Sequence, residues 1–186
     1  MKKLFGFCFL LLFTISCERD DICPETTMTT PRLSVAFYDI NIQDEDTAKN
    51  VGKCRIQGVG NDAPLSGYEG SSAKNTVLLP LKTTTDNPDG ITFTTQYSII
   101  KGYNYNDNDT PDDTSDDIVT GNEDIITITY TTEQQYVSRA CGYRTVFNNV
   151  RISVENDSNN WIRLTQAVTD NLTIQNELSV HYKIYH

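Results

Sequence analysis

Residues 125–132 read Ile-Ile-Thr-Ile-Thr-Tyr-Thr-Thr, an unbroken run of β-branched and aromatic side chains. Such side chains suit the pleated surface of a β-sheet and lose rotamer freedom in a helix. From residue 126 to residue 131, threonine alternates with isoleucine or tyrosine, so one face of the segment is more apolar than the other. The stretch therefore predicts a strand with one face on a hydrophobic core.

Seven further segments share this character and are separated by polar turn clusters: 33–37, 50–60, 76–81, 91–100, 143–154, 161–168 and 178–185. About eight strands without intervening helices predict an all-β fold, an antiparallel β-sandwich of immunoglobulin-like architecture. The likeness concerns architecture only. Trp161 follows Cys141, so the Cys-Trp-Cys order of antibody domains is absent.

The first 16 residues have the features of a bacterial lipoprotein signal peptide. Lys2 and Lys3 precede an apolar run, 4–15, that is too short to span a bilayer, and a small residue then precedes Cys17. We expect cleavage before Cys17 and lipidation of this cysteine. Several acyl chains anchor a protein stably, because each buried CH₂ contributes about 0.8 kcal/mol. The predicted division is a signal peptide (1–16), a lipidated tether (17–30) and a β-sandwich domain (31–186).

The residues after Cys17 bear on location. The stretch Glu18, Arg19, Asp20 and Asp21 resembles the acidic signal that sends some Bacteroidota lipoproteins to the cell surface. We expect an outer-membrane lipoprotein, held to the membrane through its lipid. The sequence leaves open whether the domain is displayed on the cell surface or faces the periplasm.

The chain is acidic, with a formal net charge of −10 that becomes −12 once Lys2 and Lys3 leave with the signal. An acidic surface repels phosphate backbones, so no nucleic-acid partner is expected. Catalytic signals are weak, because the only histidines are His181 and His186 and neither G-x-S-x-G nor H-E-x-x-H occurs. We therefore expect a protein that is not an enzyme and has no obligatory cofactor.

Three cysteines remain after Cys8 is lost with the signal and Cys17 is lipidated: Cys23, Cys54 and Cys141. The envelope permits disulfides, and three cysteines allow three pairings with one cysteine left over. We favour Cys23 with Cys141, because this bridge would join the tether to the end of a strand. Cys54 lies in an alternating segment and is interpreted as a small buried hydrophobic residue.

Residues 104–117, NYNDNDTPDDTSDD, predict an exposed loop between the strands 91–100 and 125–132. Its carboxylates are oxygen ligands of the kind that Ca²⁺ prefers, and they form a weak candidate calcium site: Asp107, Asp109, Asp112, Asp113, Asp116 and Asp117. Pro111 and Asp112 break the spacing of an EF-hand loop. A solvated acidic loop without a metal is the favoured interpretation.

Asp46-Thr47-Ala48 matches the short O-glycosylation pattern of Bacteroidota, an aspartate followed by serine or threonine and then a small or apolar residue. The tripeptide lies in a polar segment, as an attached glycan would require. Thr47 is therefore a candidate modification site.

Several stretches resemble a family of uncharacterised flavobacterial (Bacteroidota) lipoproteins, a domain of unknown function. They are CERDDICPETTMTTPRLSVAFYD from Cys17, IQGVGND from Ile56, LPLKT from Leu79, DIITITYTTEQQYVSRACGYRTVFNNV from Asp124, NWI from Asn160, and the final strand to His186. The run SRACGY at 138–143 is the most specific. The resemblance implies an envelope protein and supports the pairing of Cys23 with Cys141, but it brings no activity. The acidic loop and Cys54 depart from the family pattern.

The expected function is a lipid-anchored, non-enzymatic β-sandwich that binds a protein or glycan partner at the outer membrane. The alternative is a periplasmic structural or assembly factor that works with an envelope complex.

Overall fold

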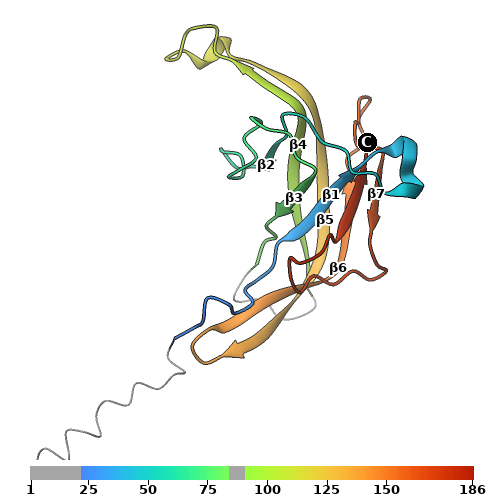
Figure 1. Cartoon of the computed structure of the whole chain (residues 1–186). Coiled ribbons are helices and arrows are strands. Elements are labelled where there is room, and N and C mark those ends of the chain that lie inside the picture. Colours follow the sequence, from blue (N-terminus) through green and yellow to red (C-terminus); the bar gives the residue numbers. More distant parts are fainter. Residues whose placement is uncertain (1–21, 84–90) are drawn as a thin grey trace, which may run out of the picture.

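The structure is a computed structural model, which describes residues 22–83 and 91–186. These residues form eight strands and two short 3₁₀ helices (Figure 1). In chain order they are β1 (Leu33–Tyr38), η3 (Ile40–Glu45), β2 (Arg55–Gly58), β3 (Thr76–Leu79), β4 (Thr92–Asn106), η4 (Thr114–Asp116), β5 (Ile118–Ser138), β6 (Gly142–Val154), β7 (Leu164–Ala167) and β8 (Tyr182–Tyr185).

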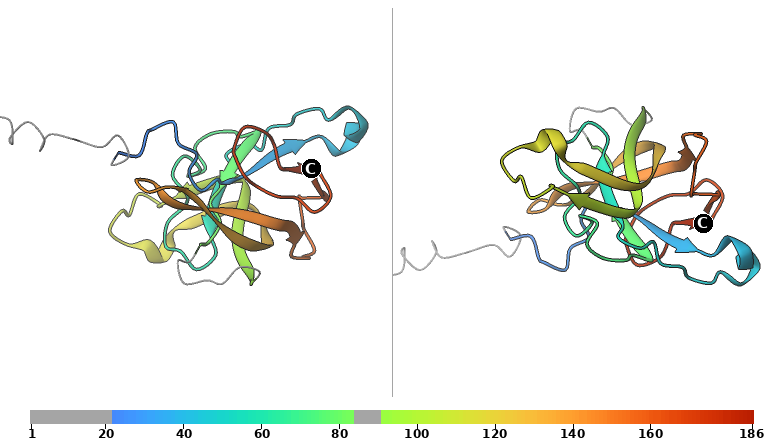
Figure 2. Two further views of the ribbon diagram at one scale, coloured as in Figure 1. Left: turned by 90° about the horizontal axis from the view of Figure 1, so that it is seen from below. Right: turned by 90° about the horizontal axis from the view of Figure 1, so that it is seen from above.

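The strands make two four-stranded sheets, one in the order β3-β1-β8-β7 and the other in the order β2-β4-β5-β6. This two-sheet arrangement confirms the predicted β-sandwich, and the views in Figure 2 show the strands of both sheets around a shared interior. One pairing differs from a purely antiparallel sandwich. Strands β1 and β8, from the two ends of the domain, run parallel, with Val35 opposite Tyr182. A parallel pair cannot be joined by a tight hairpin, and here most of the domain separates the two strands in sequence.

The core lies between the sheets and follows the alternation of the sequence. Along β5, Ile126, Ile128 and Tyr130 are buried, whereas the threonines between them are partly exposed. Phe37 of β1 packs on Trp161 with ring centroids 6.1 Å apart. Cys54 is fully buried as a free thiol in the same core, as its interpretation as a small hydrophobic residue requires.

Two strands are much longer than the sequence pattern predicts. Strand β4 has 15 residues and β5 has 21. At about 3.3 Å per residue, β5 alone is roughly 70 Å long. The predicted loop at 104–117 is correspondingly shorter, because residues 104–106 pair with residues 118–120. The ladder between these residues is made by main-chain groups. It does not require the alternation of apolar and polar side chains from which a strand is predicted.

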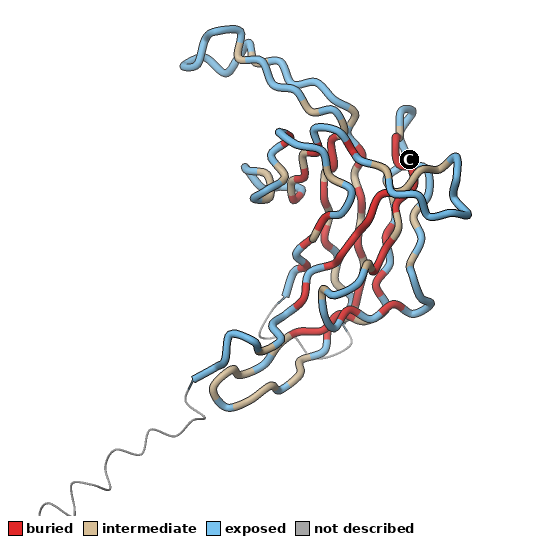
Figure 3. Tube along the Cα trace, in the orientation of Figure 1, coloured by how far each residue is buried: buried red, intermediate tan, exposed pale blue. Residues whose placement is uncertain are grey.

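A bulge marks the point where the β4–β5 hairpin leaves the sandwich. The register shifts between Lys101 and Asn104, and Gly102 and Gly121 both have positive φ there. A Cβ atom on Gly121 would lie 2.5 Å from the Ile100 side chain, so only glycine fits. Figure 3 shows the result: buried residues concentrate in the body of the sandwich, and both ends of this sheet extend beyond it.

No helix among the described residues combines the length and the apolar character needed to cross a membrane.

Candidate functional site

A disulfide fastens the tether to the far end of the β5–β6 hairpin. Cys23 and Cys141 form a disulfide with a Cα–Cα distance of 4.9 Å, which agrees with the pairing favoured from the sequence. Cys141 lies in the turn between β5 and β6, and the Thr145 N–H donates to the Thr30 hydroxyl 2.9 Å away. The predicted lipidation site, Cys17, lies outside the described residues, as does the signal peptide.

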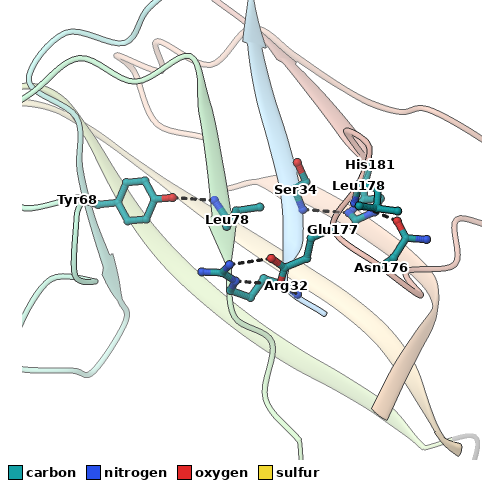
Figure 4. A network of polar contacts seen from close by, with 8 residues as sticks. All are labelled: Arg32, Ser34, Tyr68, Leu78, Asn176, Glu177, Leu178 and His181. Carbon is teal, nitrogen blue, oxygen red and sulfur yellow. Dashed lines mark hydrogen bonds and ion pairs between the residues drawn. The ribbon is translucent and has the colours of Figure 1, made fainter. Parts of the chain in front are cut away.

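An ion pair fixes the chain again at the start of β1. The guanidinium of Arg32 donates from Nε to Oε1 of Glu177 at 2.9 Å and from Nη2 to Oε2 at 2.7 Å (Figure 4). The main-chain N–H of Arg32 also donates to Oε1 at 2.7 Å. These bonds lower the pKa of the Glu177 carboxyl group, the Arg32 side-chain bond being the largest cause. The pair forms one side of a hollow of about 470 Å³ between residues 27–32 and 175–178.

His181 has a structural role beside this pair. Its Nδ1 accepts the main-chain N–H of Ser34 at 3.0 Å (Figure 4). The ring also hydrogen-bonds to the main chain of Asn176. Burial lowers the pKa of His181, so the ring is neutral at pH 7. The histidine therefore links β1 to the segment before β8.

A polar surface beside β6 and β7, separate from the hollow at Arg32 and Glu177, is the candidate for ligand binding. A hollow of about 400 Å³ lies beside β6 and β7, with Arg151, Thr169 and Asp170 among its lining residues. A neighbouring hollow of about 530 Å³ shares Asn149 and Asn171 with it. We call this joint surface the asparagine hollow. Its side chains offer amide donors and acceptors, hydroxyls, a carboxylate and a guanidinium.

The backbone presents both shared asparagines in the same unusual conformation. Asn149 has φ 54° and Asn171 has φ 51°, in the left-handed region that asparagine tolerates better than most residues. Asn149 lies at a bulge, where one extra residue of β6 interrupts its pairing with β5 between Thr129 and Thr131. This site could not be predicted from the sequence, because it joins β6 to a loop more than 20 residues later in the chain. The only local signal was the Asn148-Asn149 pair within a strand pattern.

The predicted calcium ligands lie at the tip of the β4–β5 hairpin, where they support turns. Asp107 Oδ1 accepts the Asp109 N–H at 3.2 Å, and Asp113 Oδ1 accepts the Ser115 N–H at 3.0 Å. Asp116 Oδ1 accepts from the Thr110 hydroxyl at 2.8 Å, and Asp112 lies on the same loop. Within residues 22–83 and 91–186, no three His, Cys, Asp or Glu side chains are grouped to hold a metal ion. The structure does not bring these aspartates together as a calcium site.

Thr47, the candidate glycosylation site, is exposed and follows η3. The carboxylate of Asp46 accepts from Lys183 Nζ and from the Tyr185 hydroxyl, the latter at 2.7 Å. The main-chain oxygen of Thr47 accepts the Asp39 N–H at 2.9 Å. The tripeptide is thus held against β8 with the threonine at the surface.

Two buried polar groups were not predicted from the sequence. Asp124 is fully buried in β5, and its carboxylate accepts the N–H groups of Trp161 at 3.3 Å and Ile162 at 2.7 Å. Burial raises the pKa of Asp124 despite these bonds. His186 packs edge-on against Trp161, and Lys101 Nζ lies 3.1 Å from its Nδ1.

The fold and its sites define a two-sheet β-sandwich with a covalently fastened tether and a polar surface hollow. The chain belongs to a family described as a family of unknown function (DUF6452), which matches residues 53–186. This agrees with the resemblance to a domain of unknown function. No curated protein and no solved structure matches the chain.

Proposed function

We propose that this protein is a lipid-anchored, non-enzymatic binding protein of the outer membrane. The observation that carries the proposal is the Cys23–Cys141 disulfide, which fastens the domain only six residues after the predicted lipidated Cys17. A disulfide is stable in an oxidising compartment such as the envelope, and not in the reducing cytosol. A short covalent connection suits a domain that works at the membrane surface.

The asparagine hollow supports a glycan as the partner. Sugar hydroxyls both donate and accept hydrogen bonds, and asparagine side chains do the same from one amide group. Asn149 and Asn171 present two such groups on one surface, and Arg151 and Asp170 add charged partners. A protein partner is the competing possibility, and binding experiments distinguish the two.

The anchor is tested in cells that carry the full-length gene. Metabolic labelling with an alkyne fatty acid should label the wild-type protein and leave Cys17→Ala unlabelled. Proteinase K treatment of intact cells then reports orientation. Digestion of this protein while a periplasmic control protein stays intact indicates display on the cell surface. Protection until the outer membrane is broken indicates that the domain faces the periplasm, as the alternative function, a structural or assembly factor of an envelope complex, requires. An unlabelled wild-type protein would contradict the proposal.

Binding is tested with the mature protein on an array of bacterial and host glycans. Asn149→Gly with Asn171→Gly removes both amides but keeps the positive φ angles, since glycine adopts them freely. Asn108→Gly is the matched control, because Asn108 also has positive φ (52°) but lies at the acidic hairpin tip. We expect the double variant to lose at least about tenfold in affinity, as two hydrogen bonds of about 1 kcal/mol each are removed. Equal loss in the control, or no glycan bound by the wild type, would rule out the hollow as a glycan site.

A further inference from the structure

The two ends of β5 have opposite chemical character. One end leads into the tip at 107–117, which holds six aspartates and no basic residue. The other end forms the tip of the β5–β6 hairpin, residues 136–143, which read YVSRACGY and contain one arginine and no acidic residue. Figure 1 shows these two tips at opposite ends of the molecule, with the described part of the tether, residues 22–30, at the second one.

The second tip exposes a pair of aromatic side chains. Tyr136 and Tyr143 face each other across the two strands, with ring centroids 5.4 Å apart. They are 61% and 68% exposed, whereas Tyr97, Tyr130 and Tyr182 are buried in the core. Tyrosine combines an apolar ring with a polar hydroxyl group, so it is enriched where an apolar phase meets water.

The disulfide determines how far this tyrosine pair can lie from the anchor. Cys141 belongs to the same tip, two residues before Tyr143, and it is bonded to Cys23. Cys23 lies six positions after Cys17, and six residues of extended chain reach about 20 Å at most. An acyl chain on Cys17 would therefore hold the hairpin tip close to the bilayer surface.

We propose that the β5–β6 hairpin tip rests on the bilayer, with Tyr136 and Tyr143 in the headgroup region. The inference depends on the proposed lipid anchor. The absence of carboxylates from residues 136–143 avoids repulsion by lipid phosphates, and Arg139 can pair with one. The long β5 strand then directs the acidic tip away from the membrane. The domain is thus oriented rather than freely tumbling on its tether.

Fluorescence quenching by brominated lipid tests the contact. Full-length lipidated protein is reconstituted into vesicles of phosphatidylethanolamine and phosphatidylglycerol, with or without phosphatidylcholine brominated near the top of the acyl chain. Tyr143→Trp places a reporter in the tip, and Tyr105→Trp is the control at the acidic end, where Tyr105 is 49% exposed. The native Trp161 is buried, so the wild-type protein supplies the baseline.

We expect brominated lipid to lower the added fluorescence of Tyr143→Trp at least twofold and to leave that of Tyr105→Trp unchanged. Vesicle flotation distinguishes the proposed lipid anchor from the proposed contact between the hairpin tip and the bilayer. Proteins that float but show equal quenching in both variants would overturn the membrane contact and leave the anchor intact. A wild-type protein that does not float would overturn both.

Discussion

Cys23 and Cys141 are separated by 118 residues in sequence, and their Cα atoms lie 4.9 Å apart in the fold. The bond closes residues 23–141, which include strands β1 to β5, into one loop and fastens the segment before β1 to the turn after β5. In the loop-entropy model, a closed loop of this size adds about 4–5 kcal/mol of stability. Its loss should therefore reduce stability strongly.

The double variant Cys23→Ser/Cys141→Ser should lower the free energy of unfolding by about 3–5 kcal/mol, measured by urea denaturation. Peptide mapping of the native protein without reduction should show one cross-link, between residues 23 and 141. Cys54 should resist iodoacetamide at pH 7.4, because burial raises the pKa of its thiol to about 11. A cross-link that contains Cys54 would contradict this assignment.

Asp124 joins β5 to the segment before β7 through two main-chain N–H groups. Asp124→Ala leaves the N–H groups of Trp161 and Ile162 without their buried acceptor, and we expect a loss of about 2–4 kcal/mol. The neighbouring exposed Glu123 provides the matched control, and Glu123→Ala should change stability by less than about 0.5 kcal/mol. Equal urea midpoints for the two variants would show that the Asp124 contacts contribute little.

His186 should make the fold sensitive to acid. Burial and the nearby positive charge of Lys101 lower its pKa to about 4, and Lys49 and Asp39 are the other charged groups close to it. An unfolded histidine titrates near 6.5, so between pH 6.5 and about 4 the unfolded state binds a proton that the folded state does not. Stability that is complete above pH 6.5 is therefore lost as the pH falls through this window, by about 3 kcal/mol at most.

His186→Phe tests this pH dependence. Phenylalanine can keep the packing on Phe37 and Trp161 and has no titrating group. Its urea midpoint should change less between pH 7 and pH 4 than that of the wild type. Some dependence should remain, because burial also lowers the pKa of His181. Identical pH profiles for the variant and the wild type would exclude His186 as the cause.

The acidic tip should not respond to calcium. Four of its carboxylates already accept hydrogen bonds from Asp109, Ser115, Thr110 and Tyr105 within the hairpin. We expect the same melting temperature in millimolar calcium and in EGTA, measured by scanning calorimetry. A clear rise with calcium, abolished by Asp107→Asn with Asp113→Asn, would instead support the weak calcium site predicted from the sequence.

Thr47 remains a predicted O-glycosylation site, and its side chain is exposed at the surface. The protein purified from its native host should carry excess mass on the peptide that contains Thr47, and Thr47→Ala should remove it. Asp46→Asn should weaken the contacts to Lys183 and Tyr185. Thr110, an exposed threonine preceded by Asp109 but followed by proline, is the internal control. An unmodified Thr47 peptide would remove this site from consideration.

Most strands could be predicted from local sequence because alternation reports which face is buried. The segments 33–37 and 143–154 correspond closely to β1 and β6. Strand length was less predictable at the ends of β4 and β5. Asn104 and Tyr105 pair with Thr120 and Val119 in a hairpin arm exposed to water, where no hydrophobic pattern is needed. No local residue pattern indicated that β1 and β8 pair in parallel.

The amino-acid sequence by itself determined the all-β class, the two-sheet architecture, the burial of Cys54 and the favoured pairing of Cys23 with Cys141. These properties follow from side-chain periodicity and from the small number of cysteines. Only the tertiary structure decided that Asn149 and Asn171 line the same hollow, that Asp124 accepts the N–H group of Ile162, and that Arg32 pairs with Glu177. Each of these arrangements brings together segments that are distant in sequence, and their positions depend on strand order and register, which local residue patterns do not encode.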